Sequence, residues 1–342
     1  MAEPLALERI SCPLCGAARA TPLWQEPDVV LGVPGRFAVA RCADCGLLYQ
    51  NPRVRVDDLP RLYPAHYSPY TRNPDGERAL ADGSDVRGVL ATRLGYRHLA
   101  VTTTWRSRLT GRLRRRRIEK NFPPWVGQGR LLDVGCATGR FLQRMKSIGW
   151  RVSGIEFDPA AAGIAKTVTS DIVVGDPATV TMPEHSFDLI TAFHVIEHLP
   201  DPLRALRNMF GWLAPGGLMI VEVPNAGGWG GRLFRRYWSG LDYPRHLVHF
   251  TPATMGAMIE RAGGEVVAVR YWSSPRYFTR SVRHWLGSRH GAAPHAARAA
   301  LDSRVGRGLV KLVLEVALLP ASAARAGEVA RYFIRRREGA ER

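Results

Sequence analysis

The chain has 342 residues, of which 46% are hydrophobic and 23% are charged, a composition typical of a globular protein. These fractions exclude a largely disordered chain, a collagen-like chain and a disulfide-rich mini-protein. The net charge of +18 comes mostly from arginine, because only four of the 48 basic residues are lysine. Such a bias is typical of a whole proteome, so the charge predicts only a general affinity for anionic partners.

No segment is expected to cross a membrane or to direct secretion. The longest apolar stretch, Leu309 to Leu319, is too short for a membrane span and carries Lys311 and Glu315. The first ten residues lack the basic and apolar regions of a signal peptide. We therefore expect a cytoplasmic protein.

Four of the five cysteines form two CxxC pairs, each followed by a glycine. The pairs are Cys12 with Cys15 and Cys42 with Cys45. In a cytoplasmic chain this pattern predicts a closed tetrahedral zinc site rather than disulfides, and the glycines permit a positive φ at the end of each turn. The segment resembles a zinc ribbon with structural zinc and short strands near Trp24, 29–31 and 37–40. Four free thiols or a redox pair are the alternatives.

Changes in composition divide the chain into three regions. Residues 1–70 hold the cysteine module and a tyrosine- and proline-rich linker, and residues 71–125 form a helical connector. Residues 126–342 form the main domain, with a helical insertion at about 276–326.

Within the connector, a polar stretch is followed by a helical pattern. Residues 71–85 are expected to form a loop. Residues 86–122 are expected to be helical, because Trp105, Leu109 and Leu113 repeat every four residues. The basic run Arg112 to Arg117 lies on this segment and is expected to be a solvated helix face, with phosphate binding as the alternative.

The main domain opens with an apolar run that starts at Arg130 and enters a glycine-rich turn before a helical pattern. Glycines stand at 135 and 139, with Ala137 between them, and Arg140 occupies a position where a dinucleotide-binding turn requires a small residue. The G-x-A-x-G spacing resembles motif I of class I S-adenosylmethionine-dependent methyltransferases, whose usual form is G-x-G-x-G. The alanine is tolerated if its φ is negative.

Further segments match that family in the same order. The expected strands cover the run from Arg130, then 150–159, 171–176, 187–193, 213–225, 265–272 and 328–335, and helical patterns separate most of them. The resemblance covers 126–275, returns near 328, and is nearest to the ubiquinone-biosynthesis O-methyltransferases. It implies a doubly wound, Rossmann-like α/β fold with a seven-stranded sheet whose last strand is antiparallel.

The resemblance also implies S-adenosylmethionine as the cofactor and assigns residues to it. Asp133 interacts with the ammonium group, Glu156 accepts the ribose hydroxyls, Phe157 packs on the adenine and Asp176 meets the adenine amino group. The complete expected set is Asp133, Gly135, Cys136, Ala137, Thr138, Gly139, Glu156, Phe157, Asp176, Phe193 and His194.

His194, Glu197 and His198 also match H-x-x-E-H, the signature of an inverted zinc protease. That signature requires a long helix, whereas 187–193 is predicted as a strand and prolines follow closely. We therefore expect no catalytic metal here. His194 is placed instead at the carboxyl edge of the sheet, where ligands bind in open α/β folds.

A long insert between the fifth and sixth strands contains the H-x-x-H-F-[ST] segment of the family, here His246 to Thr251. Transfer of a methyl group to a hydroxyl is helped by a base that removes the proton. His246 is the first candidate for that base, His194 the second and His249 the third. The alternative is that His246 and His249 only hold loops together. Thr251 followed by Pro252 predicts the start of a helix.

The expected function is transfer of a methyl group from S-adenosylmethionine to a hydroxyl oxygen of a small molecule, such as a sugar, quinone, polyketide or envelope-glycan precursor. Sugar C-methylation, RNA methylation and a scaffold of the same fold that binds no cofactor stay open. Nucleic acid is not the expected partner. Residues 305–320 carry an apolar stripe flanked by basic residues, for which contact with an anionic membrane, core packing and a dimer interface are the alternatives.

Overall fold

A computed structural model describes residues 4–64, 67, 83–99, 104–273, 275–289 and 325–337. Within these residues, no helix combines the length and apolar character that a membrane span requires. Most of the loop expected at 71–85 lies outside the described residues. The segment 305–320, for which membrane contact is one expectation, lies outside them as well.

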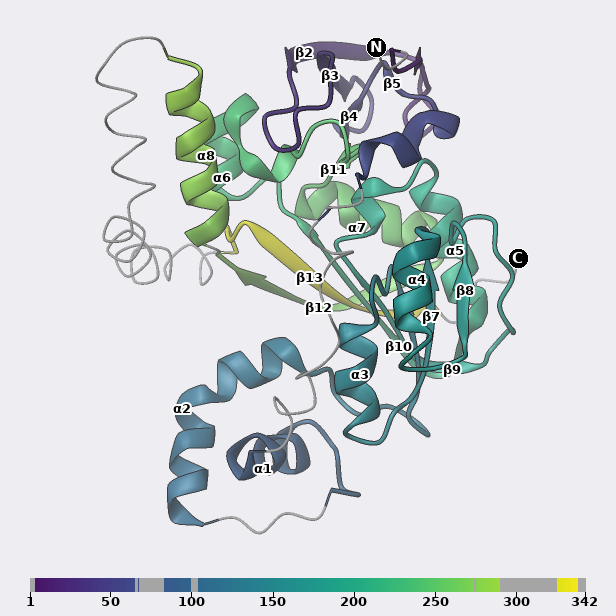
Figure 1. Cartoon of the computed structure of the whole chain (residues 1–342), viewed down its shortest axis with the longest axis vertical. Helices are drawn as coiled ribbons and strands as arrows, with labels where there is room; N and C mark the ends of the chain where they lie inside the picture. Colours follow the sequence, from purple (N-terminus) through teal and green to yellow (C-terminus); the bar gives the residue numbers. More distant parts are fainter. Residues whose placement is uncertain are drawn as a thin grey trace. The chain divides into compact units, whose positions relative to one another are not determined.

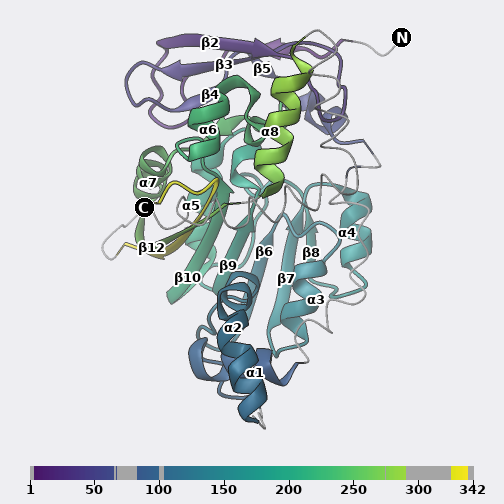
Figure 2. The ribbon, with the colours of Figure 1, turned by 90° about the vertical axis from the view of Figure 1, so that its left-hand side faces the viewer.

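The strands of the main domain form one sheet in the order β12-β13-β10-β9-β6-β7-β8, and its last strand is antiparallel (Figure 1). Their bounds are β6 Arg130–Val134, β7 Arg151–Glu156, β8 Ile172–Val174, β9 Phe187–Phe193, β10 Leu213–Pro224, β12 Gly264–Trp272 and β13 Val329–Arg336. The expected seven-stranded α/β sheet is therefore confirmed. Parallel pairing joins β6 to both β7 and β9, and β7 to β8, as Figure 2 shows.

The chain divides into two compact units, each discontinuous in sequence. One unit contains Met1–Tyr63, Phe193–Leu206 and Val221–Ile334, and the other contains Pro64–Ala192, Arg207–Ile220 and Arg335–Arg342. The boundaries expected at residues 70 and 125 stay a prediction.

In the second unit, the buried strands β6 and β9 supply an apolar core that includes Leu131, Leu132, Leu189 and Ile190. Its helices are α1 Ser84–Arg93, α2 Trp105–Asn121, α3 Arg140–Lys146 and α4 Pro159–Ala165. α3 packs on β7, and α4 packs on β7 and β8.

α1 and α2 pack against each other, and α2 confirms the helix expected from apolar spacing. Trp105, Leu109 and Leu113 nevertheless lie on its exposed side, with Leu113 78% exposed. Two of its three buried positions, Ser107 and Gly111, are small, and a Cβ added at Gly111 would lie 3.1 Å from the backbone oxygen of Asp85. Periodicity thus predicted the helix correctly but not the face through which it packs.

In the first unit, strands distant in sequence join one four-stranded sheet in the order β11-β4-β3-β2. Their bounds are β2 Ala20–Glu26, β3 Phe37–Cys42, β4 Leu48–Gln50 and β11 Val248–His249, and a two-stranded sheet pairs β1 Leu7–Glu8 with β5 Arg53–Val54. The strands expected at Trp24 and 37–40 are confirmed. The expectation at 29–31 is wrong, because there the Asp28 carboxylate accepts hydrogen bonds from the N–H groups of Val30 and Leu31 and shapes a bend.

The remaining helices lie between Val56 and Gly287 in the sequence. They are α5 Pro202–Trp212, α6 Trp229–Phe234, α7 Pro252–Arg261 and α8 Pro275–Gly287, with short 3-10 segments at Val56–Leu62, Ile196–His198, Arg235–Tyr237 and Ser239–Leu241. α7 begins as predicted. Thr251 caps it by accepting a hydrogen bond from the N–H of Thr254, and Pro252 stands in its first turn.

Candidate active site

The glycine-rich turn follows β6 and bends the backbone sharply toward β7. Gly135 has φ 72° and donates its N–H to the carbonyl of Ile155 at 2.8 Å. Gly139 has φ 80°, and a Cβ there would lie 3.1 Å from Cα of Ala165. Both glycines are therefore required by the backbone itself.

Ala137 has a φ of +47° rather than a negative one. Its N–H donates to Oε2 of Glu156 at 2.7 Å, which holds the turn in this shape. A left-handed alanine costs about 1–2 kcal/mol. The hydrogen bond to the buried carboxylate offsets part of that cost.

Glu156 ends β7 and is buried, with 4% of its surface exposed. Its Oε1 accepts the N–H of Asp158 at 2.9 Å. Burial raises the pKa of this carboxyl, and hydrogen bonds from backbone N–H groups oppose the rise. The carboxylate thus stands beside the glycine-rich turn, where the resemblance places the acceptor of the ribose hydroxyls.

Asp133 is also buried, and the hydroxyl of Thr191 donates to its Oδ1 at 2.6 Å. Burial raises its pKa to about 7, and the neighbouring charge of Glu156 adds to the rise. An approaching ammonium group would favour its ionised form. Its predicted role toward the cofactor is compatible with this setting and stays a prediction.

The other expected cofactor residues of this unit differ in exposure. Cys136 and Thr138 are buried, so their side chains pack the turn, and a Cβ on Gly154 would lie 2.6 Å from Sγ of Cys136. Phe157 is 45% exposed, which leaves its ring available to a ligand. Asp176 accepts the N–H of Ala178 at 2.7 Å through Oδ1.

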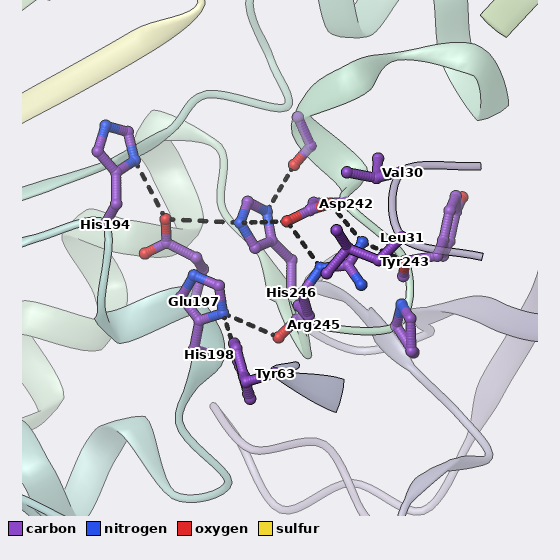
Figure 3. Close-up of polar contacts among 12 residues, drawn as sticks. Val30, Leu31, Tyr63, His194, Glu197, His198, Asp242, Tyr243, Arg245 and His246 are labelled. Atoms are coloured by element: carbon purple, nitrogen blue, oxygen red, sulfur yellow. Dashed lines mark hydrogen bonds and ion pairs between the residues drawn. The ribbon is translucent and has the colours of Figure 1, made fainter. Parts of the chain in front are cut away.

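The expected histidines belong to the other unit, where Figure 3 shows two of them, His194 and His246, in one polar network with His198. His194 follows β9 with φ 57°, and its N–H donates to the carbonyl of Glu222. Its Nδ1 lies 3.3 Å from Oε1 of Glu197, and its Nε2 lies 3.2 Å from Oε1 of Glu222. Burial alone would lower its pKa, but the two carboxylates raise it to about 10. An imidazolium has no free lone pair, so this environment does not suit His194 to the role of base.

His246 is buried, and both of its ring nitrogens face polar groups. Its Nδ1 donates to the carbonyl of Gly240 at 2.8 Å, because a carbonyl can only accept. Its Nε2 lies 3.8 Å from Oδ2 of Asp242 and 4.0 Å from Oε1 of Glu197. Of the three base candidates, His246 alone has one nitrogen fixed by a backbone carbonyl and the other beside two carboxylates.

His198 lies against His246, with ring centroids 4.6 Å apart at 87° (Figure 3). Its Nδ1 donates to the carbonyl of Arg245 at 3.1 Å and lies 2.9 Å from the hydroxyl of Tyr63. Burial lowers its pKa to about 4, so the ring is neutral. The segment Ile196–His198 is a single 3-10 turn, which confirms that no protease-like helix forms here.

His249 stands apart from this network. It lies on β11, is 3% exposed, and neither ring nitrogen has a hydrogen-bond partner within the described part of the chain. Burial lowers its pKa to about 3. Its ring lies edge-on to that of Tyr243, with the ring centroids 6.4 Å apart. This environment favours a packing role.

Several residues of the site were not predicted from the sequence. Glu222 on β10 pairs with Arg331 on β13 at 2.8 Å, and the guanidinium stacks between Phe193 at 4.7 Å and Trp272 at 4.6 Å. Phe193 therefore contacts Arg331, and its expected contact with the cofactor stays a prediction. The only sequence signal for the Glu222–Arg331 pair was that each residue is a charged position within a mostly apolar strand.

Arg245 forms a second unpredicted centre. It is fully buried and reaches Asp28 at 2.8 Å and Asp242 at 2.8 Å. It ties the N-terminal module to the loop that carries His246. The side chain of Gln50 adds a tie by donating to the carbonyls of Pro244 and His246.

The four paired cysteines meet as predicted. Their Sγ atoms all lie within 4.8 Å of one another, and the Cys12–Cys45 and Cys15–Cys42 separations are 3.5 Å. Gly16 and Gly46 follow the two pairs with φ 80° and 74°, as expected. Although burial alone would raise it, hydrogen bonds from the backbone of Cys45 and Asp44 lower the pKa of Cys42 to about 7. Four converging thiol groups fit the tetrahedral thiolate set of structural zinc.

The seven-stranded sheet and the glycine-rich turn agree with the resemblance to class I S-adenosylmethionine-dependent methyltransferases. Residues 105–269 match the family model described as a methyltransferase domain.

Curated relatives carry the same class of name. A probable S-adenosylmethionine-dependent methyltransferase of Mycolicibacterium smegmatis is 28% identical over 196 residues, covering 56% of this chain and 65% of the relative. A ubiquinone biosynthesis O-methyltransferase of Marinobacter nauticus is 34% identical over 105 residues, covering 28% of this chain and 44% of the relative. A solved S-adenosylmethionine-dependent methyltransferase from Mesorhizobium loti is 19% identical with a TM-score of 0.42, covering 67% of this chain and all of that one. The chain thus spans less than two thirds of the length of these two curated relatives.

Proposed function

We propose that the protein transfers a methyl group from S-adenosylmethionine to a hydroxyl oxygen of a small molecule. The observation that carries this proposal is the pairing of the left-handed glycine-rich turn with buried Glu156 at the end of β7. That pairing places small residues where the methionine part of the cofactor would lie, and a carboxylate where the ribose would lie. The matched methyltransferase domain supports the same reading.

The class of acceptor rests on two supports. The relative in Marinobacter nauticus is named as an O-methyltransferase, and Nε2 of His246 lies beside Glu197 and Asp242. A hydroxyl acceptor must lose a proton as the O–CH3 bond forms and the bond from sulfur to the methyl carbon breaks. We place the loss of that proton at the His246 end of the polar network.

We further propose that Cys12, Cys15, Cys42 and Cys45 hold one structural zinc ion. Four thiolates leave no open position, so zinc here would stabilise β3, β4 and the turns and would not take part in chemistry. A small-molecule acceptor as partner and a cytoplasmic location complete the proposal.

Isothermal titration calorimetry with S-adenosylmethionine and S-adenosylhomocysteine tests the cofactor assignment. We expect micromolar binding of both by the zinc-loaded full chain. Glu156→Gln should weaken binding at least tenfold, because the amide cannot accept from both ribose hydroxyls as the carboxylate does. Glu265→Gln, an exposed carboxylate on β12, is the matched control and should bind normally. Well-folded protein that binds neither ligand would favour the scaffold alternative.

A further inference from the structure

Three side chains next to the proposed acceptor region converge in a way that methyl transfer alone does not require. Glu197, His198 and His246 each offer a ligand atom within 4.8 Å of the others. The first two lie on one 3-10 turn, and the third comes from the loop after Asp242 (Figure 3). The sequence pattern H-x-x-E-H had pointed to His194 and His198 instead. The tertiary fold replaces His194 with His246.

Both histidines are oriented as metal ligands usually are. Nδ1 of His246 donates to the carbonyl of Gly240 at 2.8 Å, and Nδ1 of His198 donates to the carbonyl of Arg245 at 3.1 Å. Hydrogen bonds of this kind fix the orientation of a metal-binding ring and direct Nε2 toward the metal. The two rings therefore present Nε2 from two different loops.

Glu197 supplies the carboxylate. It is 1% exposed, and its Oε2 has no hydrogen-bond partner within the described part of the chain. A buried carboxylate oxygen without a partner is costly, so a cation beside it would explain its position. Nε2 of His246 lies 4.0 Å from Oε1 of Glu197. Metal bonds of about 2 Å would require these groups to close in by less than about 1 Å.

The charge of the surroundings favours a cation. The network holds the carboxylates Asp28, Glu197, Glu222 and Asp242 and the guanidinium groups Arg245 and Arg331. With His194 as an imidazolium, four negative charges face three positive ones, which leaves a formal charge of −1. A metal cation beside Glu197 would offset this remaining negative charge.

We propose that Glu197, His198 and His246 bind one divalent first-row transition-metal ion such as Zn²⁺. Two imidazoles and one carboxylate select this class over Mg²⁺ and Ca²⁺, which prefer oxygen ligands. Three protein ligands leave at least one position open, and an acceptor hydroxyl bound there would lose its proton more readily. The role of the metal in methyl transfer rests on the proposed function, and His246 would then act as a metal ligand rather than as the base. The metal-binding site itself does not rest on the proposed function.

Cobalt titration tests the site without any need for turnover. Protein with zinc in the cysteine site is treated with a mild chelator and titrated with Co²⁺, followed by visible absorption and metal analysis. We expect one equivalent of Co²⁺ with ligand-field bands and no thiolate-to-metal charge-transfer band. The absence of that band shows that the zinc–cysteine site has not exchanged.

Two variants and a control make the test specific. Glu197→Gln and His198→Gln should each weaken Co²⁺ binding at least tenfold, while His284→Gln on α8 should bind as the native chain does. Circular dichroism and retained S-adenosylmethionine affinity show that the variants are folded. No Co²⁺ binding by the native chain, or equal binding in both variants, would overturn the site. Cobalt binding by a chain that fails to bind S-adenosylmethionine would retain the site and reject the proposed function.

Discussion

The backbone N–H of Ala137 donates to Oε2 of Glu156 across 2.7 Å, so the glycine-rich turn and the carboxylate at the end of β7 are held by each other. The turn needs the carboxylate to keep a left-handed alanine in place. In return, the turn supplies a hydrogen-bond donor to the buried carboxylate. A substitution in the glycine-rich turn should therefore affect the Glu156 carboxylate, and a substitution of Glu156 should affect the turn.

Replacing Ala137 by glycine tests the strain in the turn. Because φ is +47°, Ala137→Gly should leave the free energy of unfolding unchanged or raise it by up to about 1 kcal/mol. Ala257→Gly, at an exposed position of α7, is the control and should lower it by about 1 kcal/mol. Urea denaturation measures both values. If Ala137→Gly lowered the free energy of unfolding as much as Ala257→Gly does, Ala137 would be unstrained.

Asp133 should make stability depend on pH. Burial raises its pKa to about 7 from 3.8, so the native state binds a proton that the unfolded state releases between these pH values. The native protein should thus lose stability from this group as pH rises from about 4 to 7, by at most roughly 4 kcal/mol. Asp133→Asn should lack that part of the slope. Denaturant unfolding at pH 5 and pH 8 measures the difference, and parallel curves for the two proteins would contradict the prediction.

The buried pair of Asp28 and Arg245 should stabilise the unit that contains both residues. Asp28→Asn should lower the free energy of unfolding by about 3 kcal/mol, because it leaves the guanidinium partly unpaired at 0% exposure. Asp57→Asn removes an exposed partner of Arg55 and should change stability by less than about 0.5 kcal/mol. Thermal or urea unfolding compares the two variants. Equal effects would show that solvent reaches the buried pair.

Loss of zinc should destabilise the unit that contains β3, β4 and β11. Cys15→Ser should abolish stoichiometric zinc at the cysteine site and lower the unfolding temperature, since a structural zinc site contributes folding free energy directly. Cys136→Ala removes the one thiol outside the cluster and should leave that zinc content unchanged. Metal analysis and differential scanning calorimetry read out both effects. Iron, or no metal, in the native chain would reject the assignment.

His246 should matter for turnover and not for cofactor affinity. Once an acceptor is found, His246→Ala should lower kcat by about 100-fold or more, whether the residue acts as base or as metal ligand. S-adenosylmethionine affinity should stay within threefold, and His284→Gln should be fully active. Unchanged turnover would remove His246 from the reaction.

Much of the main domain was determined by local sequence. Alternating apolar runs and helical patterns predicted the strands of the seven-stranded sheet, because side-chain burial in each strand depends on its own residues. The CxxC-G turns and the cap at Thr251 were predicted for the same reason, since a turn or a cap involves only a few consecutive residues. The glycine-rich turn was recognised from spacing, although the sign of φ at Ala137 was not.

Contacts between distant residues were decided only by the tertiary structure. β11 joins a sheet with strands of the N-terminal module, and Arg245 reaches Asp28, which is 217 positions away. His246 replaces His194 beside His198, and Glu222 with Arg331 surrounds His194 with charge. Such pairings depend on how loops and strands from separate parts of the chain are brought together. The charge state of each histidine follows from neighbours that its own segment does not contain.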